Sequence, residues 1–292
     1  MQNGRGHMPI PIALRPYSRT TVAGGPQLHY YDAGTAAGPP LVLIHGLGDE
    51  ADTWRHVLPQ LAARRRVIAP DLPGFGRSDK PHRAYTTAFF ARTIAALLAQ
   101  LGIARAEIVG SSMGAVVAQR LALARPALVE RLALIGGGMP ITHERIPPPL
   151  WLFLLPGLGE LSYTSLRRSQ DEAYATLRPY YHDLDALPED DRAFLRERVW
   201  ARVWSAGQRR AFLSALRWLT VDQVTRAAAF RERLARLRTP TLLIWGEHDL
   251  IASRARAEAL QALLPNARLH LIPGSGHLPQ QERPKALVEA LG

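Results

Sequence analysis

The segment Gly110-Ser111-Ser112-Met113-Gly114 holds two adjacent serines, one of which can act as a nucleophile. It fits the pattern G-x-S-x-G, with a strand-like run before it (residues 107–109) and a helical pattern after it. In this context the central serine lies at the apex of a strained turn, where small neighbours let other backbone pass closely. We therefore predict that Ser112 is the nucleophile and that Ser111 points away from the site. The alternative is that the serine only caps a helix, because serine is common at that position.

A serine hydroxyl needs a base, and the base needs an orienting carboxylate, before it reacts at neutral pH. Asp249 follows a late apolar run, and His277 lies in a glycine-rich loop after the last such run. If both runs are parallel strands, Ser112, Asp249 and His277 meet at the carboxyl edge of one sheet, in the chain order that G-x-S-x-G enzymes use. Glu247 is a rival carboxylate, and a purely structural histidine at 277 is the alternative interpretation.

The stretch "LVLIHGLGDEADTW" (residues 41–54) predicts the second half of an oxyanion site. After His45 and Gly46 the chain turns, which can direct the backbone N–H of Leu47 to the same point as the N–H of Met113. Two such donors would hold the negative oxygen that develops during attack on a carbonyl group.

The same stretch supports a competing hypothesis, a dinucleotide-dependent oxidoreductase. Gly46, Gly48 and Ala51 match G-x-G-x-x-A directly after a strand-like run, and Asp71 ends the next run, where a ribose-binding acid would lie. However, Asp71 continues into "DLPGFGRSD" instead of a helix. This hypothesis also leaves the serine, the late aspartate and the late histidine without a role.

The positions of apolar residues predict an α/β domain whose mostly parallel central sheet is flanked by helices. Short runs typical of buried strands occur at residues 41–44, 67–69, 107–109 and 132–135. Helical patterns occur between them at residues 54–63, 87–101 and 113–124, and an antiparallel pair is expected upstream. From residue 138 to residue 238 the chain becomes proline-rich and then amphipathic and helical, after which the alternating pattern returns. We expect residues 1–137 and 239–292 to form the core and residues 138–238 an inserted helical lobe.

Composition excludes several classes of protein. The 292 residues carry a formal net charge of +11, but the basic residues are spread along the chain, and we predict no nucleic-acid partner. The chain has no cysteine, which excludes disulfides, cysteine-bound zinc and a thiol nucleophile. No metal-binding spacing occurs either, so we predict neither a metal nor a cofactor.

The longest apolar segment, residues 147–159, is interrupted by Pro156 and is too short to span a bilayer. The first residues also lack the apolar run of a signal peptide. We expect a cytoplasmic protein without membrane insertion; the sequence leaves its oligomeric state open.

Five pieces of the chain together resemble the α/β-hydrolase superfamily, in its lid-bearing branch of esterases, C–C bond hydrolases, haloperoxidases, epoxide hydrolases and dehalogenases. These pieces are "HGLGDEADTW", "DLPGFGRSDKP", "VGSSMGA", "WGEHD" and "GSGH…E". The resemblance implies that Ser112 is the nucleophile, His277 the base and Asp249 the acid, with Leu47 and Met113 as the oxyanion pair. Its spacing favours Asp249 over Glu247. A serine nucleophile argues against the dehalogenase and epoxide hydrolase branches, which use an aspartate.

Within that branch the sequence favours a carboxylesterase that acts on small to medium hydrophobic esters through an acyl-serine intermediate. The C–C bond hydrolases of the meta-cleavage type are the alternative, because they often share a G-x-S-M-G turn. This chain instead follows His277 with "LPQQE" where a tryptophan is common in those enzymes, and its oxyanion loop reads "GLGDEA". A ligand-binding receptor of the same fold, with slow turnover, is a third hypothesis.

By the same resemblance, residues 138–238 form a lid that sets substrate choice over a small-molecule site. Apolar and aromatic side chains of the lobe, together with one histidine of the oxyanion loop, are candidates for the substrate pocket: His45, Trp151, Phe153, Leu154, Leu155 and Trp218. The alternative interpretation is that the lobe residues are ordinary core, since apolar residues at helical spacing usually are.

Overall fold

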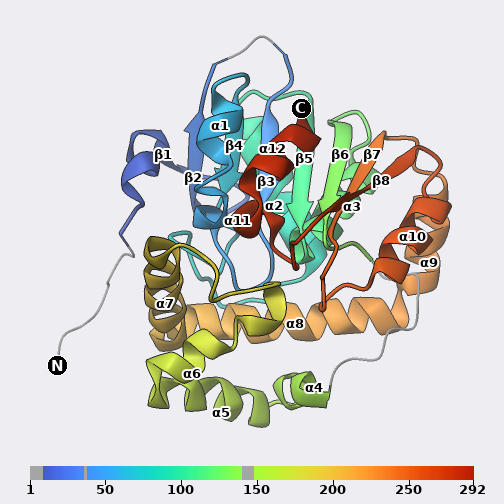
Figure 1. Cartoon of the computed structure of the whole chain (residues 1–292). Helices are drawn as coiled ribbons and strands as arrows, with labels where there is room; N and C mark the ends of the chain where they lie inside the picture. The colour runs from blue at the N-terminus through green and yellow to red at the C-terminus, as the bar shows by residue number, and fades with distance from the viewer. Residues whose placement is uncertain (1–8, 36–37, 140–147) are drawn as a thin grey trace.

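The computed structural model describes residues 9–35, 38–139 and 148–292. Within it, eight strands lie side by side in one sheet, which extends across Figure 1. Their order is β1-β2-β4-β3-β5-β6-β7-β8. β1 and β2 are antiparallel to their neighbours, and all other pairs are parallel. The bounds are β1 (Ser18–Val22), β2 (Gln27–Ala33), β3 (Leu41–Ile44), β4 (Val67–Pro70), β5 (Ala106–Ser111), β6 (Val129–Ile135), β7 (Thr241–Gly246) and β8 (Ala267–Ile272). The predicted mostly parallel sheet is confirmed.

Helices cover both faces of this sheet because its central strands are apolar on both sides. In β3, Val42 and Ile44 belong to one buried cluster and Leu41 and Leu43 to the other, as expected when successive side chains point to opposite faces. One face packs against α2 (Thr87–Gln100), α3 (Met113–Ala124) and α10 (Arg254–Leu263). The other packs against α1 (Leu58–Ala62) and α12 (Pro284–Leu291), which lie in front of the sheet in Figure 1.

Between β6 and β7 the chain leaves the sheet and forms a group of inserted helices. They are α4 (Pro148–Leu154), α5 (Leu158–Ser165), η3 (Leu166–Arg168), α6 (Gln170–Ala175), η4 (Arg178–Tyr180), α7 (Glu189–Trp204), α8 (Ala206–Thr225) and α9 (Ala227–Ala235). Figure 1 shows α8 running across one end of the sheet, with α4, α5 and α6 beyond it. The Tyr85 N–H, which follows β4, donates to Ser214 Oγ of α8 at 3.1 Å. The inserted helices therefore contact a segment that follows β4, and their role as a lid stays a prediction. Residues 140–147, near the start of the predicted lobe, lie outside the described residues.

The sequence predicts one continuous helix at residues 54–63, and this prediction is wrong. The structure has a 3-10 helix, η2 (Ala51–Trp54), then a turn, and then α1. The buried residues of this segment have helical spacing: Trp54, Val57, Leu58 and Leu61. A 3-10 turn followed by a short α-helix produces the same spacing as one continuous helix. Outside the insertion, two further short elements in the described part of the chain were not predicted: η1 (Ile12–Tyr17) and α11 (Pro279–Glu282).

No helix in the described part of the chain combines the length and the apolar character needed to cross a membrane. The cytoplasmic location stays a prediction.

Candidate active site

Ser112 lies between the end of β5 and the start of α3 in a strained backbone conformation, with φ 54° and ψ −116°. Among the described residues it is the only non-glycine with a positive φ. The flanking glycines permit this turn: a Cβ at Gly110 would lie 2.3 Å from the carbonyl oxygen of Gly114, and one at Gly114 would lie 2.4 Å from that of Ile44. Such strain persists only where the surrounding structure enforces it, and it is concentrated at functional sites.

His277 and Asp249 form a buried pair in the loops after β8 and β7. The distance from His277 Nδ1 to Asp249 Oδ2 is 2.8 Å, and each side chain is only 1% exposed. The other carboxylate oxygen of Asp249 accepts the N–H groups of Ile251 and Ala252, which fixes the acid. Because a carboxylate only accepts, Nδ1 is the donor in this contact, and in the neutral ring Nε2 then keeps its lone pair. His277 Nε2 is buried and has no hydrogen-bond partner among the described residues.

Two glycines after β6 connect this pair to the serine. A Cβ at Gly136 would lie 3.0 Å from both Asp249 Oδ2 and His277 Nδ1, and one at the adjacent Gly137 would lie 2.3 Å from the backbone oxygen of Ser112. These adjacent glycines contact the acid–base pair on one side and the backbone of Ser112 on the other, and the joint action of the three residues stays a prediction.

The rival side chains lie elsewhere. Ser111 is fully buried, and its Oγ accepts a hydrogen bond from Gln280 Nε2 at 3.4 Å. Glu247 is exposed, accepts the N–H of Gly274 at 3.4 Å and lies 3.7 Å from His248 Nε2. Neither competes for the contact between Asp249 and His277.

The loop after β3 runs beside the serine. A Cβ at Gly46 would lie 3.2 Å from Ser112 Cβ, and Leu47 follows immediately. The N–H groups of Leu47 and Met113 donate to no acceptor within the part of the chain that is described. Both N–H groups are thus free to donate to a ligand, and their role as an oxyanion pair stays a prediction.

His45 stabilises this loop from inside. Its Nδ1 lies 2.8 Å from the carbonyl oxygen of Gly46, and its Nε2 accepts the N–H of Leu72 at 2.9 Å. Burial lowers the pKa of His45, which keeps the ring neutral. Both ring nitrogens are thus engaged with the backbone, and a role of His45 in the substrate pocket stays a prediction that this geometry does not favour.

Asp71, the candidate ribose ligand of the competing hypothesis, is committed to internal contacts. Its buried carboxylate accepts the N–H groups of Ala51 and Arg77 and lies 2.9 Å from His29 Nδ1. Burial alone would raise the pKa of Asp71, but the hydrogen bond and charge of His29, the charge of Arg77 and the N–H of Ala51 together outweigh it, and the net pKa is lowered. The carboxylate therefore fastens the loops after β3 and β4 and is not available to a dinucleotide.

Two further residues support the His277 loop. The Tyr180 carbonyl oxygen accepts the His277 N–H at 2.8 Å, and the two rings lie 5.8 Å apart. Glu282 accepts the N–H groups of Gly276 and His182, each at 2.7 Å, and burial raises its pKa. Glu282 is the glutamate of the piece "GSGH…E", to which the sequence assigned no role, and the sequence did not single out Tyr180.

The predicted pocket residues of the inserted helices lie in different surroundings. Phe153 is half-buried, and its ring lies 6.2 Å from that of Phe212 of α8. Leu154 and Trp218 are also half-buried, whereas Trp151 and Leu155 are 57% and 52% exposed. A lining role for each of them stays a prediction.

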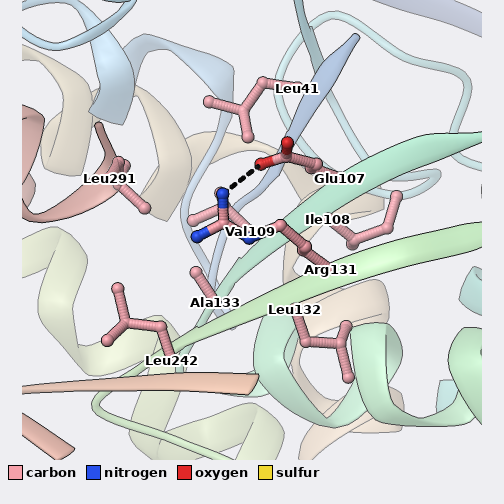
Figure 2. A pocket seen from close by; sticks show the side chains of 9 residues that line it. All are labelled: Leu41, Glu107, Ile108, Val109, Arg131, Leu132, Ala133, Leu242 and Leu291. Carbon is pink, nitrogen blue, oxygen red and sulfur yellow. Dashed lines mark ion pairs between the residues drawn. The ribbon is translucent and has the colours of Figure 1, made fainter. Parts of the chain in front are cut away.

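A small pocket at the opposite end of the sheet does not compete with this site. Figure 2 shows it near the starts of β3 and β5, with an ion pair between Arg131 and Glu107 beside Leu41 and Leu291. Its volume of about 10 Å³ holds at most about one water molecule. Within the described ranges, no group of three or more His, Cys, Asp or Glu side chains could hold a metal ion.

The fold and the site define a class of protein. Residues 39–284 match the family model described as alpha/beta hydrolase fold, and the chain belongs to this family of hydrolases.

Relatives within the family carry more specific names. The chain is 31% identical over 261 residues to a 2-hydroxy-6-oxononadienedioate/2-hydroxy-6-oxononatrienedioate hydrolase of Pseudomonas putida, covering 88% of this chain and 87% of that one. It is 32% identical over 281 residues to the 2-hydroxymuconate semialdehyde hydrolase of Pseudomonas sp. strain CF600, covering 94% and 92%.

Solved structures resemble it over most of their length. Cfl2 from Burkholderia cenocepacia superposes with a TM-score of 0.79 at 28% identity, covering 94% of both chains. The meta-cleavage product hydrolase CumD from Pseudomonas fluorescens IP01, as a serine-to-alanine mutant complexed with acetates, gives a TM-score of 0.73 at 25% identity, covering 94% of this chain and 97% of that one. The sequence alone favours an ester substrate, whereas the named relatives favour its alternative, a C–C bond hydrolase.

Proposed function

We propose that the chain is a serine hydrolase that cleaves a C–C bond next to the oxo group of a 2-hydroxy-6-oxo-dienoate. The observation that carries the serine hydrolase is the buried pair of Asp249 and His277 beside the strained turn at Ser112. The names of the relatives support the substrate class. These relatives are similar over nearly the whole chain, including the inserted helices.

In the first step, Ser112 Oγ attacks the oxo carbon while His277 Nε2 takes its proton. Asp249 holds the imidazole in the tautomer that can accept this proton and stabilises the resulting cation. The carbonyl oxygen becomes negative and accepts hydrogen bonds from the N–H groups of Leu47 and Met113.

In the second step, the bond from the former oxo carbon to the dienoate chain breaks. Before this step the 2-hydroxyl proton has moved to the chain carbon next to the oxo carbon, which gives the 2-keto form. The electron pair left on that carbon delocalises through the neighbouring double bond onto the 2-oxygen, and the proton held by His277 goes to the resulting enolate. An acyl-serine remains. A water molecule then gives a proton to His277 and attacks the acyl carbon, which releases a carboxylic acid and regenerates Ser112.

A carboxylesterase is the second candidate, and it would use the same residues with an alkoxide as leaving group. Two features of this chain favour it: Leu278 follows His277, and the oxyanion loop carries Asp49 and Glu50 in place of glycines. A receptor with the same triad would bind its ligand and release the product very slowly.

The test has two stages. A fluorophosphonate probe, with peptide mass spectrometry, should label Ser112 and not Ser111; an unlabelled folded protein would contradict the serine hydrolase. The kcat/KM for a 2-hydroxy-6-oxo-dienoate is then compared with that for a p-nitrophenyl ester of similar size, with Ser112→Ala as the blank. A higher value for the dienoate supports C–C cleavage, a higher value for the ester supports the carboxylesterase, and a single turnover on both supports the receptor.

A further inference from the structure

Two inserted helices contact three consecutive residues of the loop after β3. Arg202 Nη2 of α7 lies 3.0 Å from Asp49 Oδ1 and 3.2 Å from Glu50 Oε1. The Phe212 ring of α8 lies 3.1 Å from the position of a Cβ at Gly48. Gly48 has φ +73°, a conformation that favours glycine, and the close ring also leaves little room for a larger residue. Residues 48–50 directly follow Leu47, the candidate oxyanion donor.

These contacts lie in a buried environment. Glu50 is fully buried and the Arg202 side chain is 13% exposed. Glu50 Oε2 is buried without a hydrogen-bond partner in the described structure, and the guanidinium of Arg202 favours the ionised form of Glu50 against the effect of burial. Arg198, one turn earlier on α7, lies 3.7 Å from Glu50 Oε1 but pairs more closely with Asp52, at 2.9 Å. Arg202 is therefore the cation that contacts Glu50 most closely.

A buried ion pair of this kind is weak evidence for overall stability, because desolvation offsets much of the attraction. It is better suited to specifying one geometry, since a carboxylate and a guanidinium placed out of water have few alternative partners. The ion pair fixes the backbone of Asp49 and Glu50, and the direction of the Leu47 N–H depends on this part of the loop. A donor acts only when it lies about 2.7–3.1 Å from the oxyanion.

We propose that Arg202 is a positioning residue that holds the oxyanion loop, through Asp49 and Glu50, so that the N–H of Leu47 points at the oxyanion. Phe212 supports the same turn from α8. The inserted helices would then complete the catalytic site as well as cover it. This inference rests on the proposed serine hydrolase and applies equally to a C–C bond or an ester substrate.

Arg202→Met tests the inference, because it keeps most of the side-chain stem and removes the charge. Arg196→Met is the matched control on the same helix, since the Arg196 side chain is 40% exposed and forms its ion pair with Asp171 at the surface. Each full-length variant is assayed on whichever substrate the wild type turns over. The Ki of a trifluoromethyl ketone is measured as well, because Ser112 would convert it into a bound oxyanion.

We expect Arg202→Met to lower kcat by about 10- to 100-fold, with KM within about twofold of the wild type. The Ki of the ketone should rise by a similar factor, because it reports the oxyanion contact directly. Arg196→Met should change all three by less than about twofold. An unchanged kcat in Arg202→Met, or a raised KM with an unchanged Ki, would overturn the inference, since the arginine would then be dispensable or would bind the substrate itself.

Glu50→Gln is the second variant, in case Arg202→Met does not fold. It preserves shape and removes only the carboxylate, so we expect the same split between kcat and KM at a smaller amplitude. A folded Glu50→Gln protein with wild-type kcat and Ki would contradict the inference. Failure of the proposed function is a separate result, because the wild-type protein would then show neither labelling of Ser112 nor turnover.

Discussion

The imidazole of His277 and the carboxylate of Asp249 lie 2.8 Å apart, although 28 positions separate them in the chain. Each side chain stands in a loop directly after a parallel strand, and β7 and β8 are neighbours in the sheet. The pairing of these strands thus brings acid and base together. Because both side chains are almost completely buried, their contact is shielded from solvent and strongly orients the ring.

Asp249→Asn should lower kcat by about 10³- to 10⁴-fold, because an amide can donate to Nδ1 and so favour the wrong tautomer of His277. Steady-state kinetics on the wild-type substrate measures the effect. Glu247→Gln is the control and should stay within about twofold, since that side chain is exposed and does not contact the histidine. A larger loss in Glu247→Gln than in Asp249→Asn would reverse the assignment of the acid.

Substitution of Ser112 should separate activity from stability. Ser112→Ala and Ser112→Gly should both lower turnover by about 10⁴-fold or more, since each lacks the nucleophile. Only the glycine variant relieves the positive φ of 54°, so its free energy of unfolding should exceed that of the alanine variant by about 1 kcal/mol. Urea unfolding compares the two. A loss of activity below tenfold would remove Ser112 from the nucleophile role, and equal stabilities would mean that the turn is not strained.

Glu50 should make the stability of the protein fall as pH rises. Burial raises the pKa of Glu50 from 4.5 to about 7, even though Arg202 opposes the shift. Between pH 4.5 and about pH 7 the native state keeps the proton on Glu50, whereas the unfolded chain has lost it. The stability that this group contributes is therefore complete below pH 4.5 and is lost as the pH rises through about 7. Glu50→Gln cannot ionise and should lose less stability than the wild type between about pH 5 and about pH 8.

Urea unfolding of both proteins at the two pH values measures this difference. Glu232→Gln, at an exposed position on α9, is the control and should follow the wild type. If Glu50→Gln also followed the wild type, the carboxyl group would titrate normally in the folded protein.

Glu282→Gln should weaken the support of the His277 loop. The amide keeps the shape of the side chain, but it cannot accept hydrogen bonds at both former carboxylate oxygens, so the N–H of Gly276 or His182 loses its partner. We expect a loss of about 1–3 kcal/mol in the free energy of unfolding and about a tenfold lower kcat, because His277 is adjacent to Gly276. Glu289→Gln, exposed on α12, should change neither quantity. Wild-type kinetics in Glu282→Gln would show that the loop is held by other contacts.

Local patterns in the sequence were sufficient to predict the sheet and the family. Apolar runs such as residues 41–44 and 132–135 are strands because their side chains are buried on both faces, and that requirement is visible in composition alone. The turn at Ser112 was predictable for a similar reason, since only glycines fit beside it and they appear as a fixed local spacing.

The tertiary structure decided what depends on contacts between distant residues. The sequence could not choose between Asp249 and Glu247 without the family spacing, because both follow the same strand and only the fold shows which one reaches His277. It gave no indication of Arg202 or Tyr180, whose partners lie about a hundred or more positions away. The amphipathic helices of the insertion could pack in many ways, because the periodicity of their apolar residues indicates only that one face of each helix is buried. What that face is buried against, and which loop it holds, is fixed by the folded chain.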